Sequence, residues 1–239
     1  ELRKLFNGQP EDVINFFFFV AEEVRSYMSK LGFKTFNEMI GQSQYLDTNK
    51  AIDHWKTEGL DFTKLFFKPE PWKGDLLYQS QDQDHDIFNI LDRKLIEKSK
   101  PAIENSSPVQ ISSDINNTDR SVGAMLSGIV AKKFGHKGLP DESINIKLTG
   151  TAGQSFGAFL AKGISLELQG EGNDYVGKGI SGGRIAIYPP TNSNIIPEEN
   201  IIVGNTVLYG GITGECYFNG IAGERFAVRN SGATAVVEG

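Results

Sequence analysis

Two overlapping glycine-rich stretches are the residues of this sequence whose spacing could bind a nucleotide. Residues 172–178, Gly-Asn-Asp-Tyr-Val-Gly-Lys, match the phosphate-loop pattern G-x-x-x-x-G-K-[ST] up to its last position, where Gly179 replaces the hydroxyl residue. Such a loop must open a helix so that its amides face the phosphate, but the strand-like run 184–187 follows. Residues 177–182 fit G-x-G-x-x-G without the strand and helix that a dinucleotide-binding unit needs. Turn glycines are the favoured interpretation of both stretches, and a phosphate site is the alternative.

The histidines and the one cysteine show no spacing that indicates a metal site or a nucleophile. His54, His85 and His136 are scattered, with no carboxylate or thiol at ligand spacing, which favours surface or packing roles. Cys216 falls in the predicted strand 215–218, where a free cysteine usually fills apolar space. No adjacent base can be named for it.

Four charged residues fall at the corners of a repeat described below: Asp174, Lys178, Glu224 and Arg225. Exposed charges are usually solvated or loosely paired, so we interpret them as bridges between turns or as contacts with another domain. Asn105-Ser-Ser107 and Asn116-Asn-Thr118 match glycosylation acceptors, which carry weight only in a secreted protein. These residues therefore predict no catalytic, cofactor-binding or metal-binding site in the chain.

A glycine-led repeat occupies the second half of the sequence. Gly153 and Gly172 are as far apart as Gly204 and Gly223, and the interval between these two pairs is lengthened by an insertion around 189–200. One position after each glycine is a polar residue (Gln154, Asn173, Asn205, Glu224), and three positions after it is an apolar one (Phe156, Tyr175, Val207, Phe226). A repeat of roughly 20 residues is typical of a solenoid whose turns bury their apolar faces against one another. We expect the apolar set inside one stack and the polar set in a hydrogen-bonded ladder at one corner.

The spacing of apolar residues predicts the elements that carry this repeat. From Ile144 onward apolar residues alternate with polar ones in runs that end at glycine or proline, as strands do. Parallel stacking of such strands predicts a right-handed parallel β-helix over 118–239, with glycine at corners of positive φ.

Helices are predicted before the repeat. Pro10 and Gly32 delimit the first, and Thr35 with Glu38 forms a capping box for a short second one. Residues 86–98 predict a third, closed by Pro101. A fourth is predicted over 122–134, with its cap at 117–119.

Composition excludes several classes of protein. The 239 residues are 39% hydrophobic and 23% charged, which indicates a globular chain. The net charge of −6 argues against nucleic acid as a partner, and no run of 18 apolar residues predicts a membrane span. The chain starts at Glu1 without a secretory leader and holds one cysteine, so we expect a cytoplasmic protein and a piece of a longer polypeptide.

Several of these stretches resemble one known family. Residues 150–157 (Gly-Thr-Ala-Gly-Gln-Ser-Phe-Gly), 172–179, 203–206 and 222–231 resemble the glycine-repeat (GXGXG) domain of the glutamate synthase large (α) subunit. Residues 117–123 resemble the segment that enters that domain. Residues 1–6 and 13–25 are similar to the last helices of the FMN-binding synthase domain of the same family.

The resemblance implies a parent enzyme that hydrolyses glutamine, passes ammonia to 2-oxoglutarate and reduces the imine to glutamate with FMN and a 3Fe–4S cluster. It also implies that the residues for this chemistry lie elsewhere. The family's amidotransferase begins with a nucleophilic N-terminal cysteine, whereas this chain begins with Glu1, and Cys216 matches no cluster ligand. Residues 230–238 look more like the bacterial pyridine-nucleotide-dependent type, which implies NADPH and a small NADPH-oxidising subunit.

The predicted organisation has three parts. Residues 1–40 are expected to be the C-terminal helices of a (β/α)8 FMN-binding domain, 41–117 an irregular connector with one helix, and 118–239 a GXGXG β-helix domain truncated at its C-terminus. The expected role is to scaffold and dock catalytic domains, with other domains of the same large subunit as partners. One alternative is a binding or assembly module like the glycine-repeat subunit of formylmethanofuran dehydrogenase. Another is an autonomous enzyme with a phosphate site at 172–179.

Overall fold

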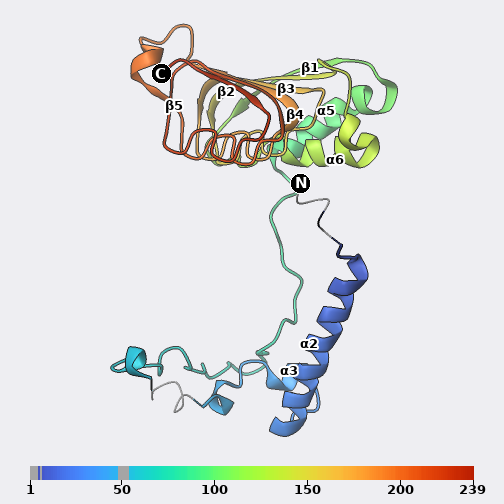
Figure 1. The fold of residues 1–239 in the computed structure, drawn as a ribbon, viewed down its shortest axis with the longest axis vertical. Coiled ribbons are helices and arrows are strands. Elements are labelled where there is room, and N and C mark those ends of the chain that lie inside the picture. Colours follow the sequence, from blue (N-terminus) through green and yellow to red (C-terminus); the bar gives the residue numbers. More distant parts are fainter. Residues whose placement is uncertain (1–4, 6, 48–53) are drawn as a thin grey trace. The chain divides into compact units, whose positions relative to one another are not determined.

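The computed structural model describes residue 5, residues 7–47 and residues 54–239, and it divides into two compact units (Figure 1). The first is Glu1–His85 and the second is Asp86–Gly239. Of the stretch 1–6, which contributes to the resemblance, only residue 5 is described. The expected boundaries at 40 and 117 stay a prediction.

The first unit contains the two helices predicted from their terminal residues. Helix α2 (Pro10–Leu31) starts at its proline and ends at Gly32, whose φ of 82° is left-handed. Helix α3 (Phe36–Met39) is preceded by Thr35, and its capping box with Glu38 is present. Two single 3-10 turns, η1 (Ser43–Tyr45) and η2 (Trp55–Thr57), follow. The two predicted helices are therefore confirmed, because their start and stop signals are local.

Helix α2 exposes its apolar side chains. All of its residues are described and none is buried. Its four consecutive phenylalanines, residues 16–19, are each between 60% and 72% exposed. No helix in the described part of the chain is long and apolar enough to cross a membrane.

The second unit begins with two helices whose termini differ from the predictions. Helix α5 (Leu91–Asn105) starts later than 86 and continues through Pro101, because Ala102 and Ile103 beyond it are buried in the core. Helix α6 (Ala124–Phe134) is followed by the turn η3 (Gly135–Lys137). Its N-cap is Gly123, so the predicted cap at 117–119 is wrong. Asp119 instead accepts from the Asn116 amide, 2.9 Å away, in the turn before the helix.

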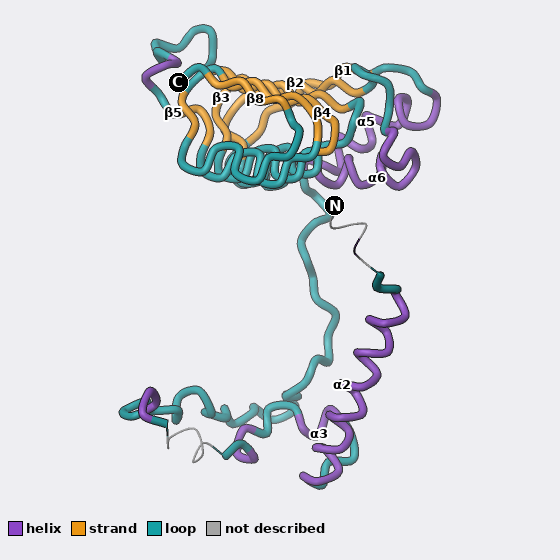
Figure 2. The backbone as a smooth tube through the Cα atoms, viewed as in Figure 1, coloured by secondary structure: helices purple, strands orange, loops and turns teal. Residues whose placement is uncertain are grey.

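Eight strands, all parallel, form one open sheet (Figure 2). They are β1 (Val109–Ile115), β2 (Ile144–Ala152), β3 (Ile164–Gly172), β4 (Ser181–Tyr188), β5 (Ile201–Val203), β6 (Thr213–Phe218), β7 (Ile221–Ala222) and β8 (Thr234–Val237). The main row runs β1-β2-β3-β4-β6-β8. β5 pairs with the end of β3 at Gly172, and β7 pairs with β5. The fold is therefore mixed α and β, with an all-parallel sheet that has β1 and β8 at its ends.

Between the strands, the turns of successive repeats bond to one another through the backbone, and Figure 2 shows these loops stacked along the unit. The Ser155 amide donates to the Asp174 carbonyl of the following turn, 2.8 Å away. Other amides of a turn donate in the opposite direction. The Gly177 amide, for example, donates to the Phe156 carbonyl of the preceding turn, also at 2.8 Å. Equivalent bonds recur at the amides of Gly157, Tyr175, Thr206, Leu208 and Ala227.

The reversal follows from backbone that alternates in handedness. In the first complete turn Ser155, Gly157 and Phe159 have φ of 63°, 67° and 57°, and the residues between them are not left-handed. Each change of hand rotates the next peptide plane, so amides two residues apart point to opposite neighbours. The same alternation occupies three further turns, at Tyr175, Gly177 and Gly179, at Thr206, Leu208 and Gly210, and at Arg225, Ala227 and Arg229.

The structure corrects the predicted register of the second repeat. Tyr175 is 38% exposed, and the buried position is taken by Val176, at 0% exposure. Strand pairing aligns Gly172 with Ala152 and Val203, so the residue equivalent to Gly153 is Asn173. The predicted equivalence of Gly172 with the other three leading glycines is therefore wrong by one position. Phe156 and Val207 are buried as expected, and Phe226 packs against the core.

The core lies between the strands and the turns, and α5 and α6 cover its first end. Leu95 of α5, Leu126 and Val130 of α6 and the strand residues Ile146 and Leu166 belong to one cluster of buried side chains. Terminal elements that shield the first rung are typical of stacked repeats.

Candidate functional site

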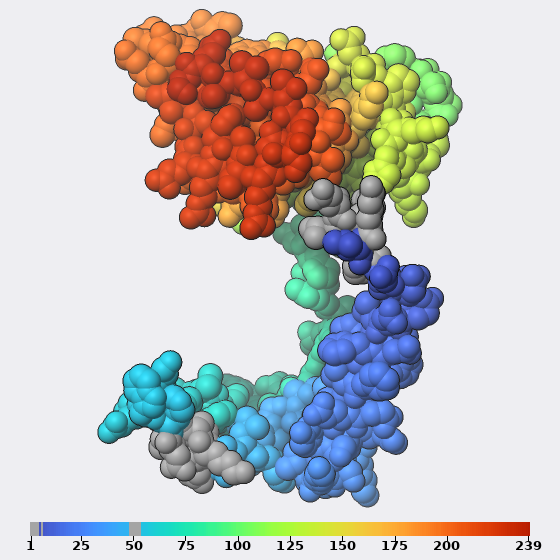
Figure 3. All heavy atoms as spheres, viewed as in Figure 1, coloured from blue at the N-terminus to red at the C-terminus, as the bar shows by residue number. Residues whose placement is uncertain are grey.

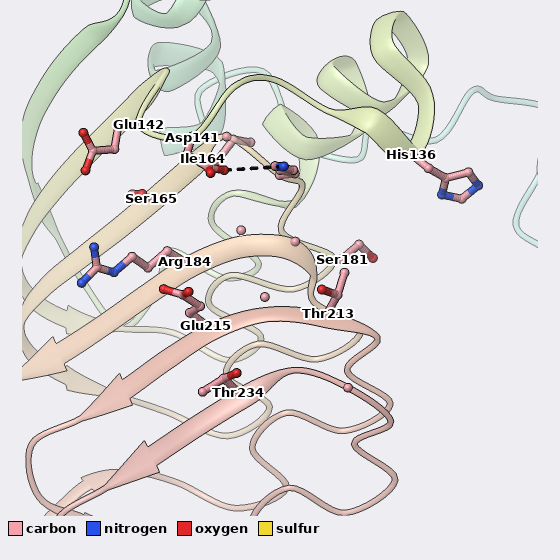
Figure 4. Close-up of a pocket in the computed structure, with 16 residues that line it drawn as sticks. His136, Asp141, Glu142, Ile164, Ser165, Ser181, Arg184, Thr213, Glu215 and Thr234 are labelled. Carbon is pink, nitrogen blue, oxygen red and sulfur yellow. Dashed lines mark ion pairs between the residues drawn. The ribbon is translucent and has the colours of Figure 1, made fainter.

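A polar groove crosses the beginning of the strands of the main row (Figure 4). It has a volume of about 440 Å³. Ser165, Arg184, Glu215 and Thr234 are aligned across it, because each is the register partner of the next on β3, β4, β6 and β8. Five glycines lie between these side chains: Gly163, Gly182, Gly183, Gly214 and Gly232.

The charges of the groove are mixed. Lys162 lies 3.9 Å from Asp141 in an ion pair, with both side chains substantially exposed. The Arg184 guanidinium lies 5.3 Å from the Tyr217 ring centroid rather than in an ion pair with Glu215. His136 also lines the groove. Exposed, mixed charges of this kind contribute little binding energy each, so the groove suits a polar surface contact better than a buried ligand.

The hydroxyl groups of the groove show no activated nucleophile among the described residues. Ser181 Oγ donates to the Gly179 carbonyl, 2.9 Å away, rather than to a base. Nucleophilic catalysis by a serine requires a base within hydrogen-bond distance. Nor do three or more His, Cys, Asp or Glu side chains come together anywhere in the described part of the chain so as to hold a metal ion.

A second polar cluster lies on the outer face of the sheet. Glu167 accepts from the Tyr188 hydroxyl, and its Oε1 lies 3.0 Å from Lys147 Nζ. The bonds from Tyr188 and Lys147 lower the pKa of Glu167, and the bond to Glu167 raises the pKa values of Lys147 and Tyr188. All three groups keep their ordinary charges at neutral pH. The cluster therefore ties neighbouring strands together rather than providing a group that exchanges protons.

The stretch 172–179 does not form a phosphate cradle. Its amides already have acceptors: Tyr175 N donates to Asn205, Gly177 N to Phe156 and Gly179 N to Tyr209. The strand β4 follows, not a helix. Lys178 Nζ lies 5.5 Å from the Tyr175 ring centroid, next to its own turn. The turn-glycine interpretation accounts for this geometry.

The polar ladder at the corner joins side chains to the backbone of the next turn. Asp174 Oδ1 accepts from the Asn205 amide, and Asn205 Oδ1 accepts from the Glu224 amide, each at 2.7 Å. The bond from Asn173 to Asn117, at 2.9 Å, joins two side-chain amides, but Asn117 is not one of the four predicted ladder residues. The expectation of stacked side-chain amides is therefore not met within the predicted set, where the step from Asn205 to Glu224 joins an amide oxygen to a backbone amide.

Two further candidates of the sequence belong to different units. Cys216 is fully buried on β6, and burial raises the pKa of its thiol to about 12. His54 stacks on Trp55 in the first unit, at 5.9 Å between ring centroids, and accepts from the Lys56 amide. The prediction that the chain has no catalytic residue stays a prediction.

Asp92 is a buried carboxylate with a structural role that the sequence did not indicate. Its carboxylate is 3% exposed and accepts from three amides at the start of α6: Gly123 at 2.7 Å, Met125 at 2.8 Å and Leu126 at 3.3 Å. Burial raises the pKa of Asp92, and the three amide donors offset part of that rise. No local pattern could reveal this cap, since the donors belong to a different helix far along the chain.

Comparison with known proteins gives one family and a set of relatives. Residues 92–239 match the GXGXG motif family. The whole chain is 52% identical to glutamate synthase [NADH] of Schizosaccharomyces pombe and 47% identical to the glutamate synthase [NADPH] large chain of Bacillus subtilis. It is 42% identical to ferredoxin-dependent glutamate synthase 2 of Synechocystis. The chain spans only 11%, 16% and 15% of these three proteins, respectively.

Proposed function

Because this chain belongs to the GXGXG family, we propose that it is part of the large chain of a glutamate synthase, and that its second unit is a scaffold for the catalytic domains. The observation that carries the proposal is identity of 52% and 47% along the whole chain to two such enzymes. The parent enzyme would form two glutamates from glutamine, 2-oxoglutarate and a reductant.

In this proposal the second unit winds as a right-handed parallel β-helix. Three features support it: every strand is parallel, the register advances by about one repeat per strand, and the turns bond rung to rung. A body held by continuous backbone bonds is rigid, which suits a scaffold between moving domains.

The first unit would contribute to the FMN-binding domain. The exposed phenylalanines of α2 support this assignment, because an apolar helix surface of this kind is normally buried against other protein. Residues 1–40 would be the last helices of a (β/α)8 domain and 41–117 a connector.

The cofactors of the proposed enzyme would be held outside this chain. An iron–sulfur cluster needs several thiolates, but the sequence has one cysteine, and that thiol is buried with its pKa raised to about 12. FMN carries a phosphate, and the amides at 175, 177 and 179 are already bonded to neighbouring turns. The single buried thiol therefore does not fit a cluster, and the stretch 172–179 does not fit the phosphate of FMN.

The reductant and the cellular location belong to the proposal as well. We favour a pyridine nucleotide, passed on by a small NADPH-oxidising subunit, since the two pyridine-nucleotide-dependent relatives named above are more similar to this chain than the ferredoxin-dependent one. Both subunits would be cytoplasmic.

Purification of the 239-residue chain tests this assignment. We expect no flavin absorbance and no glutamate formed from glutamine, 2-oxoglutarate and NADPH. Bound FMN together with turnover would refute the scaffold role. Affinity capture with the chain from its source cell should retain a glutamate synthase small subunit, whereas retention of a molybdenum or tungsten enzyme would support the alternative of a formylmethanofuran dehydrogenase-type module.

A further inference from the structure

The excursion at residues 189–201 is the segment of the second unit that departs from the repeat without contributing a strand to the main row. It leaves β4 at two prolines, forms the single turn η4 (Pro197–Glu199) and returns through β5. In Figures 1 and 3 its orange chain stands out from the rest of the unit next to β5. Insertions into one repeat of a stacked protein commonly carry its binding surface.

The excursion presents aliphatic side chains to solvent. Ile195, Ile196 and Ile201 are 45%, 47% and 64% exposed. Ile195 and Ile201 line a groove of about 400 Å³ together with Pro189, Pro190 and Pro197. Gly150 of β2 and Gly170 of β3 also line this groove. Clustered exposed apolar residues of this kind mark interaction surfaces more often than isolated ones do.

The segment is held in this conformation by its own hydrogen bonds. Ser193 donates to the Pro190 carbonyl through both its amide, at 2.9 Å, and its hydroxyl, at 2.7 Å. Asn200 fixes the other side, because its Nδ2 donates to the Ile196 carbonyl at 2.8 Å and its amide to the Pro197 carbonyl at 3.2 Å. The isoleucines therefore face solvent on a formed surface, which lowers the entropic cost of binding.

The charged residues that line the groove or lie on η4 are acidic. Glu171 lines it, and Glu198 and Glu199 lie on η4 beside Pro197. Asn219, another lining residue, donates to the carboxylate of Glu238. The sequence has no lysine or arginine between Arg184 and Arg225, or within 149–151 and 169–173. An apolar surface with an acidic rim is complementary to an apolar segment flanked by basic residues.

We propose that the excursion 189–201 and its groove dock a basic, apolar segment of another domain of the same large chain. This inference rests on the proposed function, since most of the length of the related glutamate synthases lies outside the region that this chain matches. The aliphatic side chains would enter the groove, and lysine side chains would meet the carboxylates of Glu171, Glu198 and Glu199.

Carbodiimide cross-linking of the purified full-length protein tests the proposal without any substitution. The reagent joins carboxylates to lysines in direct contact, and mass spectrometry identifies the joined peptides. We expect Glu171, Glu198 or Glu199 to be joined to a lysine that belongs to the same full-length polypeptide but lies outside the 239 residues of this chain. Joining only to lysines within the chain, to a second isotope-labelled copy or to a separate protein would overturn the proposal, as would no joining of these carboxylates.

A pair of matched variants tests the aliphatic contribution. Ile195→Asp with Ile201→Asp should reduce the yield of that cross-link at least tenfold. Asn192→Asp with Asn194→Asp adds the same charge at exposed positions of the same segment and should leave the yield within twofold. Equal yields in both variants would contradict the docking. Glutamate formation by the unmodified protein, measured in parallel, distinguishes the docking proposal from the proposed function. Activity without the cross-link would contradict the docking proposal alone, and absence of activity would contradict the proposed function.

Discussion

At the scale of single residues, Asp92 connects two helices of the second unit. One carboxylate satisfies three amides at the start of α6 and joins that helix to α5. We expect Asp92→Ala to lower the free energy of unfolding by about 3 kcal/mol, because three buried donors lose a charged acceptor. Urea denaturation of the purified chain measures this. Asp114→Asn, at an exposed position of β1, is the control and should change stability by less than about 0.5 kcal/mol.

The ionisation of Asp92 should also shape the pH dependence of stability. Burial raises its pKa above the ordinary 3.8, so the folded chain holds this proton over a range where the unfolded chain has released it. Stability contributed at this site is therefore greatest below the ordinary pKa and falls as pH rises through the raised value. The difference in unfolding free energy between the native chain and Asp92→Asn, followed upward from pH 4, should show this decline. A rise over the same range would contradict it.

Cys216 should be chemically silent while the chain is folded. With its pKa at about 12 and its side chain buried, roughly one thiol in ten thousand is ionised at pH 8. Iodoacetamide labelling, followed by mass spectrometry, should be at least a hundredfold slower in buffer than in concentrated urea. Equal rates would mean that β6 opens readily.

At the scale of elements, the glycines of the rungs are required for two different reasons. Gly170 has φ of 153°, and a methyl group there would overlap the Gly150 carbonyl oxygen of the neighbouring strand. Gly210 also has positive φ, 66°, but nothing lies within 4 Å of the methyl group that alanine would add. Gly170→Ala should therefore cost at least about 3 kcal/mol, whereas Gly210→Ala should cost about 1 kcal/mol for the left-handed backbone alone. Thermal unfolding of the two variants measures the cost of the steric overlap apart from the cost of the left-handed backbone. Equal losses of stability in the two variants would contradict this distinction.

Elements defined by local signals were predictable, and those defined by tertiary contacts were not. Pro10 and Gly32 delimit α2 because each acts on its own backbone. The cap of α6 was misplaced because its acceptor, Asp92, comes from another helix. The second repeat was shifted by one residue because Asn173 stands at the position equivalent to Gly153, while the nearby Gly172 aligns with Ala152. Glycine spacing therefore indicated repeated units of strand and turn but not which residues are equivalent.

At the scale of the whole molecule, the two units differ in what they bury. The second has one contiguous apolar core, whereas α2 in the first buries no side chain. The purified chain should therefore bind a hydrophobic dye strongly. Phe16→Glu with Phe19→Glu should halve the dye fluorescence at least, since glutamate preserves helix propensity while removing apolar surface. Glu22→Gln with Glu23→Gln, one turn further on, is the control and should leave the signal unchanged or higher.

The candidate site was harder to predict from the sequence than the fold was. The groove across β3, β4, β6 and β8 depends on register between strands that are separated by whole repeats, and only the paired backbone reveals it. The surface at 189–201 was visible in the sequence as an interruption of the repeat. Its exposed isoleucines could not be told from core residues, because exposure depends on how the excursion leaves the stack.

The alternating backbone of the turns has a consequence for how such a chain can change during evolution. Each rung offers its neighbours the same pattern of donors and acceptors on both sides, whichever side chains it carries. An in-frame gene duplication of one complete rung would therefore insert a ready-made layer without altering the pairing of any other. Length is thus a property that this architecture can gain or lose in whole steps.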